Sequence, residues 1–125
     1  MILGFKPEFE PKIQSGVKIH SIREDLKDRW KPKMTVHMAV GVRTKHYRCF
    51  MVRKLWHVAR IEIRYNGCGL DEIIAPDIII DRYHLKDWEK LVLAKNDGFD
   101  SLGDFLQWFN KDFTGKILHW TDFRY

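Results

Sequence analysis

Cysteine is scarce in this sequence, and long apolar runs are missing. Only two of its 125 residues are cysteines, Cys49 and Cys68, and they do not form a CxxC spacing. We therefore expect free thiols in a reducing compartment and no disulfide framework. No apolar run approaches the ~18 residues of a membrane span, and the first residues lack the basic and apolar segments of a signal peptide. These absences predict a soluble cytoplasmic protein.

Motifs for metal, phosphate or nucleophilic chemistry are also absent. The six histidines form none of the spacings HxH, HxxxH or HExxH, although alternation along strands could still bring some of them together. Gly67 and Gly69 lack the lysine and the strand–loop–helix setting of a phosphate loop. No G-x-S-x-G nucleophile elbow occurs, so a Ser-His-Asp triad has no sequence signal, although it is not excluded. We expect neither a metal ion nor a bound cofactor.

Repeats, linkers and low-complexity tracts are likewise missing. Apolar residues make up 45% of the chain and aromatic residues 14%, which is enough to form a core. At roughly 150 residues per domain, this length predicts a single domain over residues 1–125.

What the chain does have is an uneven distribution of charge. Residues 1–65 carry 15 Lys and Arg against 6 Asp and Glu, a net charge of +9, whereas residues 66–125 carry 7 against 11, a net charge of −4. The whole chain therefore has a net charge of +5. A basic half favours an anionic partner, and nucleic acid is the commonest one. The alternative is that these side chains only solvate the outer face of a sheet.

The order of the apolar patterns predicts an α+β fold. A short helix carrying Phe9 and Ile13 and ended by Gly16 is expected after the first strand. A turn is expected at residues 66–69. The segment 48–64 is too long for one straight strand, so it predicts two strands or one strongly curved strand. Strands are expected at residues 2–5, 19–24, 34–42, 48–64, 73–83 and 117–125. Val36, Met38 and Val40 alternate onto one face of the third, and the continuous apolar run at residues 78–80 is typical of a buried strand.

Two helices are expected before the last strand. The first carries Leu85, Trp88, Leu91 and Val92 on one face. The second begins at Ser101, which forms a capping-box-like pair with Asp104, and Gly115 ends the connection that follows it. The resulting order, β-α-β-β-β-β-α-α-β, indicates a small, curved, mostly antiparallel sheet with flanking helices.

Five tryptophans stand out among the aromatic residues. Trp30 and Trp56 have basic neighbours, so they could stack on bases while lysines bind phosphates. We expect Trp88 and Trp108 in the core, because they lie in helical apolar patterns. For Trp30, which lies in a charged turn, a surface position and a core position both remain open.

The most distinctive segment is G-V-K-I-H-S-I-R, from Gly16 to Arg23. Lys18 and Ser21 are three residues apart, so on a regular strand they would point to opposite faces and would converge only if the chain turns between them. A lysine can act as the base for a neighbouring hydroxyl when burial lowers its pKa. The alternative is an exposed Lys18 and a Ser21 that caps a turn.

This segment resembles the G-x-K-x-x-[ST]-I-R motif of the ASCH family, whose domains are similar to the PUA domain of RNA-modifying proteins. The segment from Asp97 to Ser101 resembles the family's [ED]-G-F-x-S motif. The resemblance spans nearly the whole chain and suggests the stand-alone prokaryotic or phage type. It is weakest over residues 68–95, which we interpret as a lineage-specific elaboration. Other matching positions are Phe5, Phe9, Arg29, Trp30, Lys31, Met34, His37, residues 41–44, Phe105, Trp108, Phe109, Gly115, Lys116, His119 and Trp120.

The resemblance implies a small, curved or closed, PUA-like β-barrel with a cleft lined by the G-x-K motif. It also implies that this cleft binds single-stranded RNA or a nucleotide. In one bacterial branch it implies an amidohydrolase that removes the acetyl group from N4-acetylcytidine with a Lys, a Thr and a Glu. Those positions correspond here to Lys18, Ser21 and Asp97. Ser21 keeps the hydroxyl nucleophile, whereas Asp97 is one carbon shorter than the Glu, and the segment 68–95 is absent from that compact branch.

Two main functions remain open. As a binding module, the cleft would hold RNA or a nucleotide, with basic side chains on phosphates and an aromatic ring on a base. As an amide hydrolase, Ser21 would attack the carbonyl, Lys18 would take its proton, and Asp97 would orient Lys18 or place a water. A third possibility is an interaction domain with a vestigial cleft. The residues assigned to nucleic-acid binding are Lys18, Arg23, Arg29, Trp30, Arg43 and Lys45.

Overall fold

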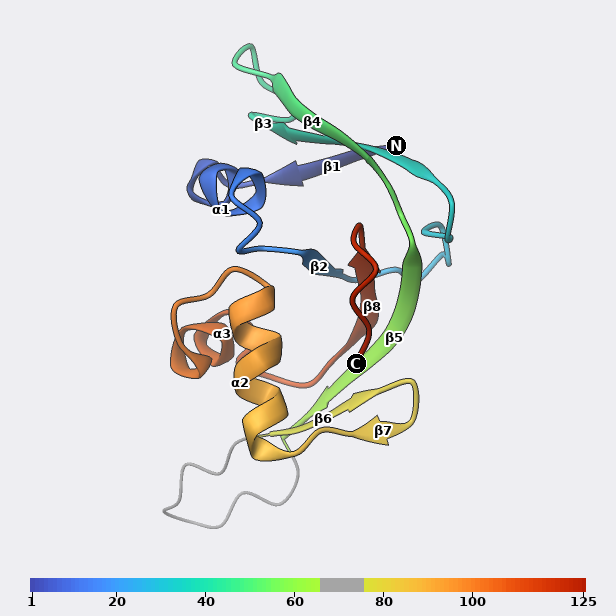
Figure 1. Cartoon of the computed structure of the whole chain (residues 1–125), viewed down its shortest axis with the longest axis vertical. Helices are drawn as coiled ribbons and strands as arrows, with labels where there is room; N and C mark the ends of the chain where they lie inside the picture. The colour runs from blue at the N-terminus through green and yellow to red at the C-terminus, as the bar shows by residue number, and fades with distance from the viewer. Residues whose placement is uncertain (66–75) are drawn as a thin grey trace.

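The computed structural model describes residues 1–65 and 76–125, which form two mostly antiparallel sheets and three α-helices (Figure 1). The predicted α+β class is confirmed. The predicted turn at residues 66–69, Cys68 and the beginning of the predicted strand 73–83 lie outside the described residues. Within the described ranges no helix has the length and apolar character to span a membrane. The thiol of Cys49 is free and exposed.

The smaller sheet has three strands in the order β1-β3-β4. β1 runs parallel to β3, whereas β3 and β4 form an antiparallel hairpin. Val36, Met38 and Val40 are buried, as their alternation predicted. The strands are β1 (Ile2–Phe5), β3 (Thr35–Val40) and β4 (Arg48–Lys54).

The larger sheet has five strands in the order β2-β8-β5-β6-β7, all antiparallel to their neighbours. Its inner face buries Ile61, Ile78 and Ile117. The apolar run at residues 78–80 is therefore part of a strand, as its composition indicated. The strands are β2 (His20–Arg23), β5 (His57–Arg64), β6 (Asp77–Ile80), β7 (Tyr83–His84) and β8 (Phe113–His119).

The long predicted segment 48–64 is two strands that belong to different sheets. β4 and β5 are separated by Leu55 and Trp56 and follow one another along a curve (Figure 1). The backbone of Leu55 bonds to Lys33 and Met34 beside the small sheet, whereas the N–H of Trp56 donates to the carbonyl of His119 in the large sheet. Leu55 is buried, and it anchors the corner at which the chain changes sheets.

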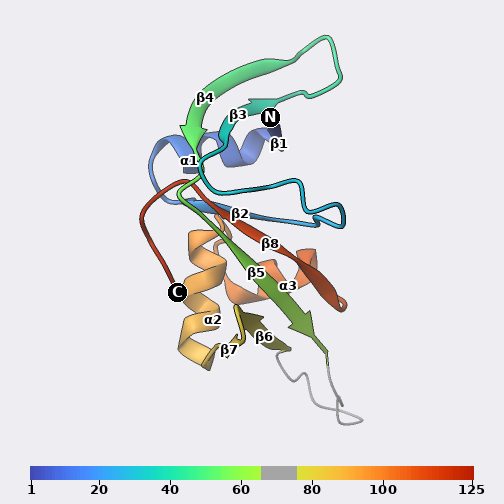
Figure 2. The ribbon, with the colours of Figure 1, turned by 90° about the vertical axis from the view of Figure 1, so that its right-hand side faces the viewer.

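The two sheets do not close into a barrel within the described residues. The small sheet lies at one end of the large one (Figure 2). β1 and β2 are joined by a side chain instead of a strand ladder, because Arg23 Nη2 donates to the carbonyl oxygen of Gly4 over 2.6 Å. The side chain of Arg23 therefore links these two strands, which share no strand ladder.

The helices lie on one side of the sheets (Figures 1 and 2). After α1 the chain reverses at Gly16, which has φ +84° and ends the helix as predicted. Ser101 accepts a hydrogen bond from the N–H of Asp104 and begins α3 as expected. Leu93 and Phe105 pack the last two helices onto the large sheet. The helical segments are the 3₁₀ turn η1 (Pro7–Phe9), α1 (Glu10–Gln14), α2 (Asp87–Asn96) and α3 (Leu102–Trp108).

The expectation that Trp88 and Trp108 belong to the core is wrong, because their exposed fractions are 65% and 47%. The buried positions of α2 are instead Lys90, Leu93 and Ala94, and its C-cap Asp97 is buried as well. These four have the i, i+3, i+4, i+7 spacing of one helix face, but two of them are charged. A pattern defined by apolar residues alone therefore selected Trp88 and Leu91, which are exposed.

The position of the last strand also differs from the expectation. The strand begins at Phe113 and ends at His119, so Gly115 lies inside it and does not end the preceding connection. Gly115 pairs with Ile61 of β5. A Cβ atom at this position would lie 2.4 Å from the carbonyl oxygen of Arg23. The glycine is needed because the backbone of β2 passes so close.

We expect Gly115→Ala to lower the free energy of unfolding by about 1–3 kcal/mol, the usual cost of overpacking. The added methyl group would overlap the backbone of Arg23 and the ring of Phe113. Chemical denaturation measures the change. Gly103→Ala in α3 is the control, since a Cβ there meets only Ser101 Oγ at 3.7 Å and stability should be unchanged or slightly higher. A Gly115 variant as stable as the wild type would contradict this packing.

Candidate functional site

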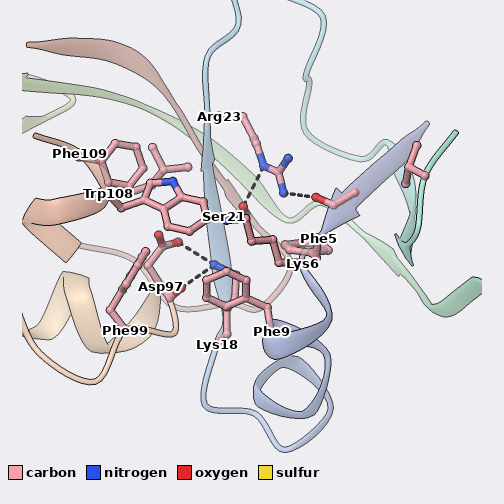
Figure 3. Close-up of a pocket in the computed structure, with 13 residues that line it drawn as sticks. Phe5, Lys6, Phe9, Lys18, Ser21, Arg23, Asp97, Phe99, Trp108 and Phe109 are labelled. Atoms are coloured by element: carbon pink, nitrogen blue, oxygen red, sulfur yellow. Dashed lines mark hydrogen bonds and ion pairs between the residues drawn. The ribbon is translucent and has the colours of Figure 1, made fainter. Parts of the chain in front are cut away.

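A pocket of about 430 Å³ lies between β1, β2 and the segment that joins α2 to α3 (Figure 3). Four of the residues singled out from the sequence line it: Lys18, Ser21, Arg23 and Asp97. They come from segments nearly eighty residues apart. The remaining lining residues are Gly4, Phe5, Lys6, Phe9, Ile22, Val42, Phe99, Trp108 and Phe109.

Lys18 and Asp97 form a buried ion pair at the floor of this pocket. Lys18 Nζ donates to Asp97 Oδ1 over 3.0 Å and to the backbone oxygen of the same residue over 2.6 Å. The exposed fractions of the two residues are both only 3%. The prediction that Asp97 orients Lys18 therefore has a direct geometric basis, and the alternative of an exposed Lys18 is wrong.

Two glycines, Gly16 before Lys18 and Gly98 after Asp97, allow the backbone turns that bring this pair together. After Gly16 the N–H groups of Val17 and Lys18 donate to the carbonyl of Lys12, so Lys18 precedes β2 in a turn and is not on the strand itself. Gly98, with φ +92°, follows Asp97 at the end of α2. A Cβ at Gly98 would lie 3.0 Å from Cδ of Lys18, so the lysine stem packs directly on this glycine.

Burial changes the acidity of the lysine. Removal from water lowers the pKa of the Lys18 ammonium below its ordinary value, and the charge and hydrogen bond of Asp97 oppose this only in part. Arg23 lowers the pKa of Lys18 further by charge repulsion. Lys18 is therefore closer to releasing a proton at neutral pH than a surface lysine.

Ser21 and Arg23 form the second polar group of the pocket. The guanidinium donates from Nε to Ser21 Oγ over 3.0 Å, and its carbon atom lies 5.0 Å from the ring centre of Phe5. Because Lys18 lies before the strand, it and Ser21 line the same pocket despite their three-residue spacing. Within the described ranges no hydrogen bond joins Lys18 to Ser21 directly.

Three aromatic rings pack against one another at the side of the pocket. The ring centres of Phe9, Phe99 and Trp108 are 5.7–5.9 Å apart, with the rings edge to face. Lys6 Nζ lies 4.7 Å from the ring centre of Trp108. Trp108 is thus both half-exposed and part of the pocket lining, so its ring is accessible to a ligand.

Two polar atoms of the pocket, one oxygen and one nitrogen, are open to a ligand. Asp97 Oδ2 and Arg23 Nη1 make no hydrogen bond to another described residue. In the part of the chain that the structure describes, His119 Nδ1 is the only buried side-chain N or O atom without a partner. The two pocket atoms are therefore accessible, one as an acceptor and one as a donor.

The sequence reasoning missed His20, Tyr125 and Asn96. His20 Nδ1 lies 3.1 Å from Asp97 Oδ1, and its Nε2 bonds the hydroxyl of Tyr125, which also accepts from Asn96 Nδ2. The position of His20 between Lys18 and Ser21 was a usable signal. Tyr125 had none, because only the fold brings its ring to β2.

The other predicted nucleic-acid residues do not line the pocket. Arg43 and Lys45 are exposed in the connection between β3 and β4, where the preceding Val42 reaches the pocket wall. Arg29 is exposed and contacts the sulfur of Met1. Trp30 is half-buried against the small sheet, which resolves its position between surface and core.

Three histidines meet across neighbouring strands. His119 of β8 pairs with His20 of β2 and with His57 of β5, and the ring centres are 5.3 and 5.6 Å apart. Among residues 1–65 and 76–125, no group of three or more His, Cys, Asp or Glu side chains has an arrangement that could hold a metal ion. Strand alternation therefore gathers the histidines without forming a metal centre there.

Comparisons with protein-family models, with curated proteins and with solved structures found no match to this chain.

The buried histidines predict that the fold is sensitive to acid. Burial lowers the pKa of His119 to about 3 and also lowers that of His20. The unfolded chain binds a proton at each below about pH 6.5, whereas the folded protein does not, so stability is complete above that pH and falls from about 6.5 toward 3. Each histidine contributes about 1.4 kcal/mol per pH unit.

Denaturation at about pH 6.5 and at about pH 5 measures this loss. In His119→Leu the loss should be smaller by about 1–2 kcal/mol, because one of the protons is no longer bound on unfolding. The substitution breaks no hydrogen bond of Nδ1, which has no partner among residues 1–65 and 76–125. The control is His46→Gln, which changes an exposed ring. Identical pH dependence in all three proteins would contradict the prediction.

Proposed function

We propose that the pocket binds the base of a nucleotide, either free or within single-stranded RNA. The observation that carries the proposal is an aromatic wall opposite a floor with one open acceptor and one open donor. The volume of about 430 Å³ lies within the ~300–1,000 Å³ typical of small-molecule sites. Bases stack on aromatic rings and present both donors and acceptors at their edges.

The charges of the pocket favour a base at the floor over a phosphate. The ammonium of Lys18 already donates twice to Asp97, so it is less available to a phosphate than the sequence suggested. The cations of the pocket without an acidic partner among the described residues are Arg23, which lies beside Ser21, and Lys6, which lies over the ring of Trp108 at the aromatic side. A planar ring with an N–H next to a C=O would complement Asp97 Oδ2 and Arg23 Nη1 together.

A second surface suits the phosphates of a longer strand. The 33 residues from Arg29 to Ile61 contain nine Lys and Arg and no Asp or Glu. They include β3, β4 and their connection, and Arg43 and Lys45 lie there close to the pocket wall at Val42. Such a run attracts a polyanion whatever its base sequence. The resemblance of the sequence motifs to those of ASCH domains supports the same proposal.

Fluorescence polarisation with a short labelled single-stranded RNA, and calorimetry with nucleoside monophosphates, test this function. Trp108→Leu should weaken binding by about 1–3 kcal/mol, roughly 5- to 150-fold, because one stacking surface is lost. The matched control is Trp88→Leu, which removes a tryptophan that is 65% exposed and lies outside the pocket. Affinity for RNA should fall as salt rises. If neither probe binds at low salt, the proposal fails.

A second function, amide hydrolysis, is favoured by the position of Lys18 with its lowered pKa in the same pocket as Ser21. Ser21 Oγ would attack the carbonyl carbon while the neutral amine of Lys18 takes the hydroxyl proton. The C–N bond would break as Lys18 returns that proton to the departing nitrogen, and water would then hydrolyse the acyl-serine ester. The guanidinium of Arg23 would stabilise the alkoxide.

Incubation with N4-acetylcytidine, followed by chromatography of released cytidine, tests this second function. Ser21→Ala should lower the rate by at least about a hundredfold, because the nucleophile is lost. The control Ser15→Ala removes an exposed hydroxyl that caps the end of α1 and should leave the rate unchanged. A Ser21→Ala protein that is as active as the wild type would contradict the assignment.

A further inference from the structure

A hydrogen-bonded chain runs from the back of the pocket into the protein. Asn96 Nδ2 donates to the hydroxyl of Tyr125 over 3.2 Å, and this hydroxyl bonds His20 Nε2. His20 Nδ1 lies 3.1 Å from Asp97 Oδ1, the same oxygen to which Lys18 donates. Of these five residues only Lys18 and Asp97 line the pocket, so the other three can act on it only through Asp97.

The donors and acceptors of the chain determine where its protons lie. An amide nitrogen only donates, so Asn96 occupies a lone pair of the Tyr125 oxygen, and the phenolic proton is left for His20 Nε2. Since Nε2 then accepts, the ring proton lies on Nδ1 and is donated to Asp97. If His20 gained a second proton, Nε2 would become an N–H donor. The hydroxyl proton of Tyr125 would then no longer have Nε2 as its acceptor.

The surroundings of His20 also disfavour a positive charge. The ring is fully buried, and the positively charged ammonium of Lys18 already contacts Asp97 Oδ1, the oxygen that His20 also contacts. Burial lowers the pKa of His20, although Asp97 opposes this, and burial raises the pKa of Tyr125 so that the phenol keeps its proton. The ring of His119 packs against His20 from β8, while His57 and Arg124 act on His119.

We propose that Tyr125 and Asn96 hold His20 in its uncharged form, and that His20 is a positioning residue for the Lys18–Asp97 pair. The neutral ring holds Oδ1 of Asp97 and leaves Oδ2 open to the pocket. A charged ring would compete with Lys18 for this carboxylate and add a positive charge behind the pocket floor. The protonation of His20 does not depend on what the pocket binds, whereas its effect on a ligand rests on the proposed function.

NMR titration of the imidazole groups in the ligand-free protein, from about pH 8 to about pH 5, tests the protonation state. We expect wild-type His20 to be the Nδ1–H tautomer and not to titrate in this range. Tyr125→Phe removes the donor to Nε2 while the ring stays buried, so the pKa of His20 should rise and its titration should begin at a higher pH than in the wild type. The matched control is Tyr47→Phe, because this tyrosine is 44% exposed and its hydroxyl bonds no described residue; it should behave as the wild type.

Either of two results would overturn the proposal at this step. One is a wild-type His20 that is charged at neutral pH or carries its proton on Nε2. The other is a Tyr125→Phe protein in which His20 titrates as in the wild type. If Tyr125→Phe does not fold, the wild-type tautomer alone decides the outcome.

RNA binding of the same proteins tests the positioning role. Tyr125→Phe should bind as the wild type does at about pH 8 and lose affinity about tenfold per pH unit below the midpoint of its His20 titration, while the wild type shows no such loss. A merely structural role of Tyr125 would weaken binding equally at all pH values and would overturn the proposal. If His20 behaves as expected but no RNA binds at any pH, the proposed function fails and the protonation result stands.

Discussion

The buried ion pair of Lys18 and Asp97 is the interaction on which the site depends. Two opposite charges can be held out of water only when their hydrogen bonds are satisfied, because each charge alone would be costly to bury. The protein meets this requirement with the backbone oxygen and carboxylate of Asp97 on one side and with the donor of His20 on the other. The close approach also needs Gly98, on which the lysine stem lies.

This pair ties together parts of the chain that are far apart in sequence. Lys18 follows the first helix, whereas Asp97 ends the helix α2, and the N–H of Ile19 donates to the carbonyl of Asn96 beside them. The contact sets the distance between β2 and the α2–α3 segment, and this distance defines the width of the pocket. The aromatic side of the pocket follows from the same arrangement, since Phe99 comes two residues after Asp97 and meets Phe9 edge to face.

The fold divides the basic character of the N-terminal half between two environments. Lys18 and Arg23 are drawn into the pocket, where one is paired and the other is held against Ser21 and the carbonyl of Gly4. Arg43 and Lys45 stay exposed beyond the pocket wall. The pocket and the exposed basic side chains therefore lie at adjacent places on the protein. The excess of positive charge alone did not distinguish these two environments.

Local patterns in the sequence were sufficient for most of the strands and for the ends of helices. The alternation through Val36 and Met38, the glycine after α1 and the cap at Ser101 each depend on a few neighbouring residues, and all three are confirmed. The motif at Lys18 and Ser21 likewise identified side chains that line one pocket.

Only the tertiary structure decided which helix face is buried, where β8 begins and which groups complete the site. Lys90 and Asp97 are charged, so their burial could not be read from apolar periodicity, and that of Asp97 depends on Lys18 and His20, which come from a distant segment of the chain. Gly115 is required by the backbone of β2, a neighbour distant in sequence. Tyr125 reaches His20 only after both sheets have formed. Hydrogen bonds between distant segments leave no periodic trace, which is the physical reason that sequence patterns do not contain them.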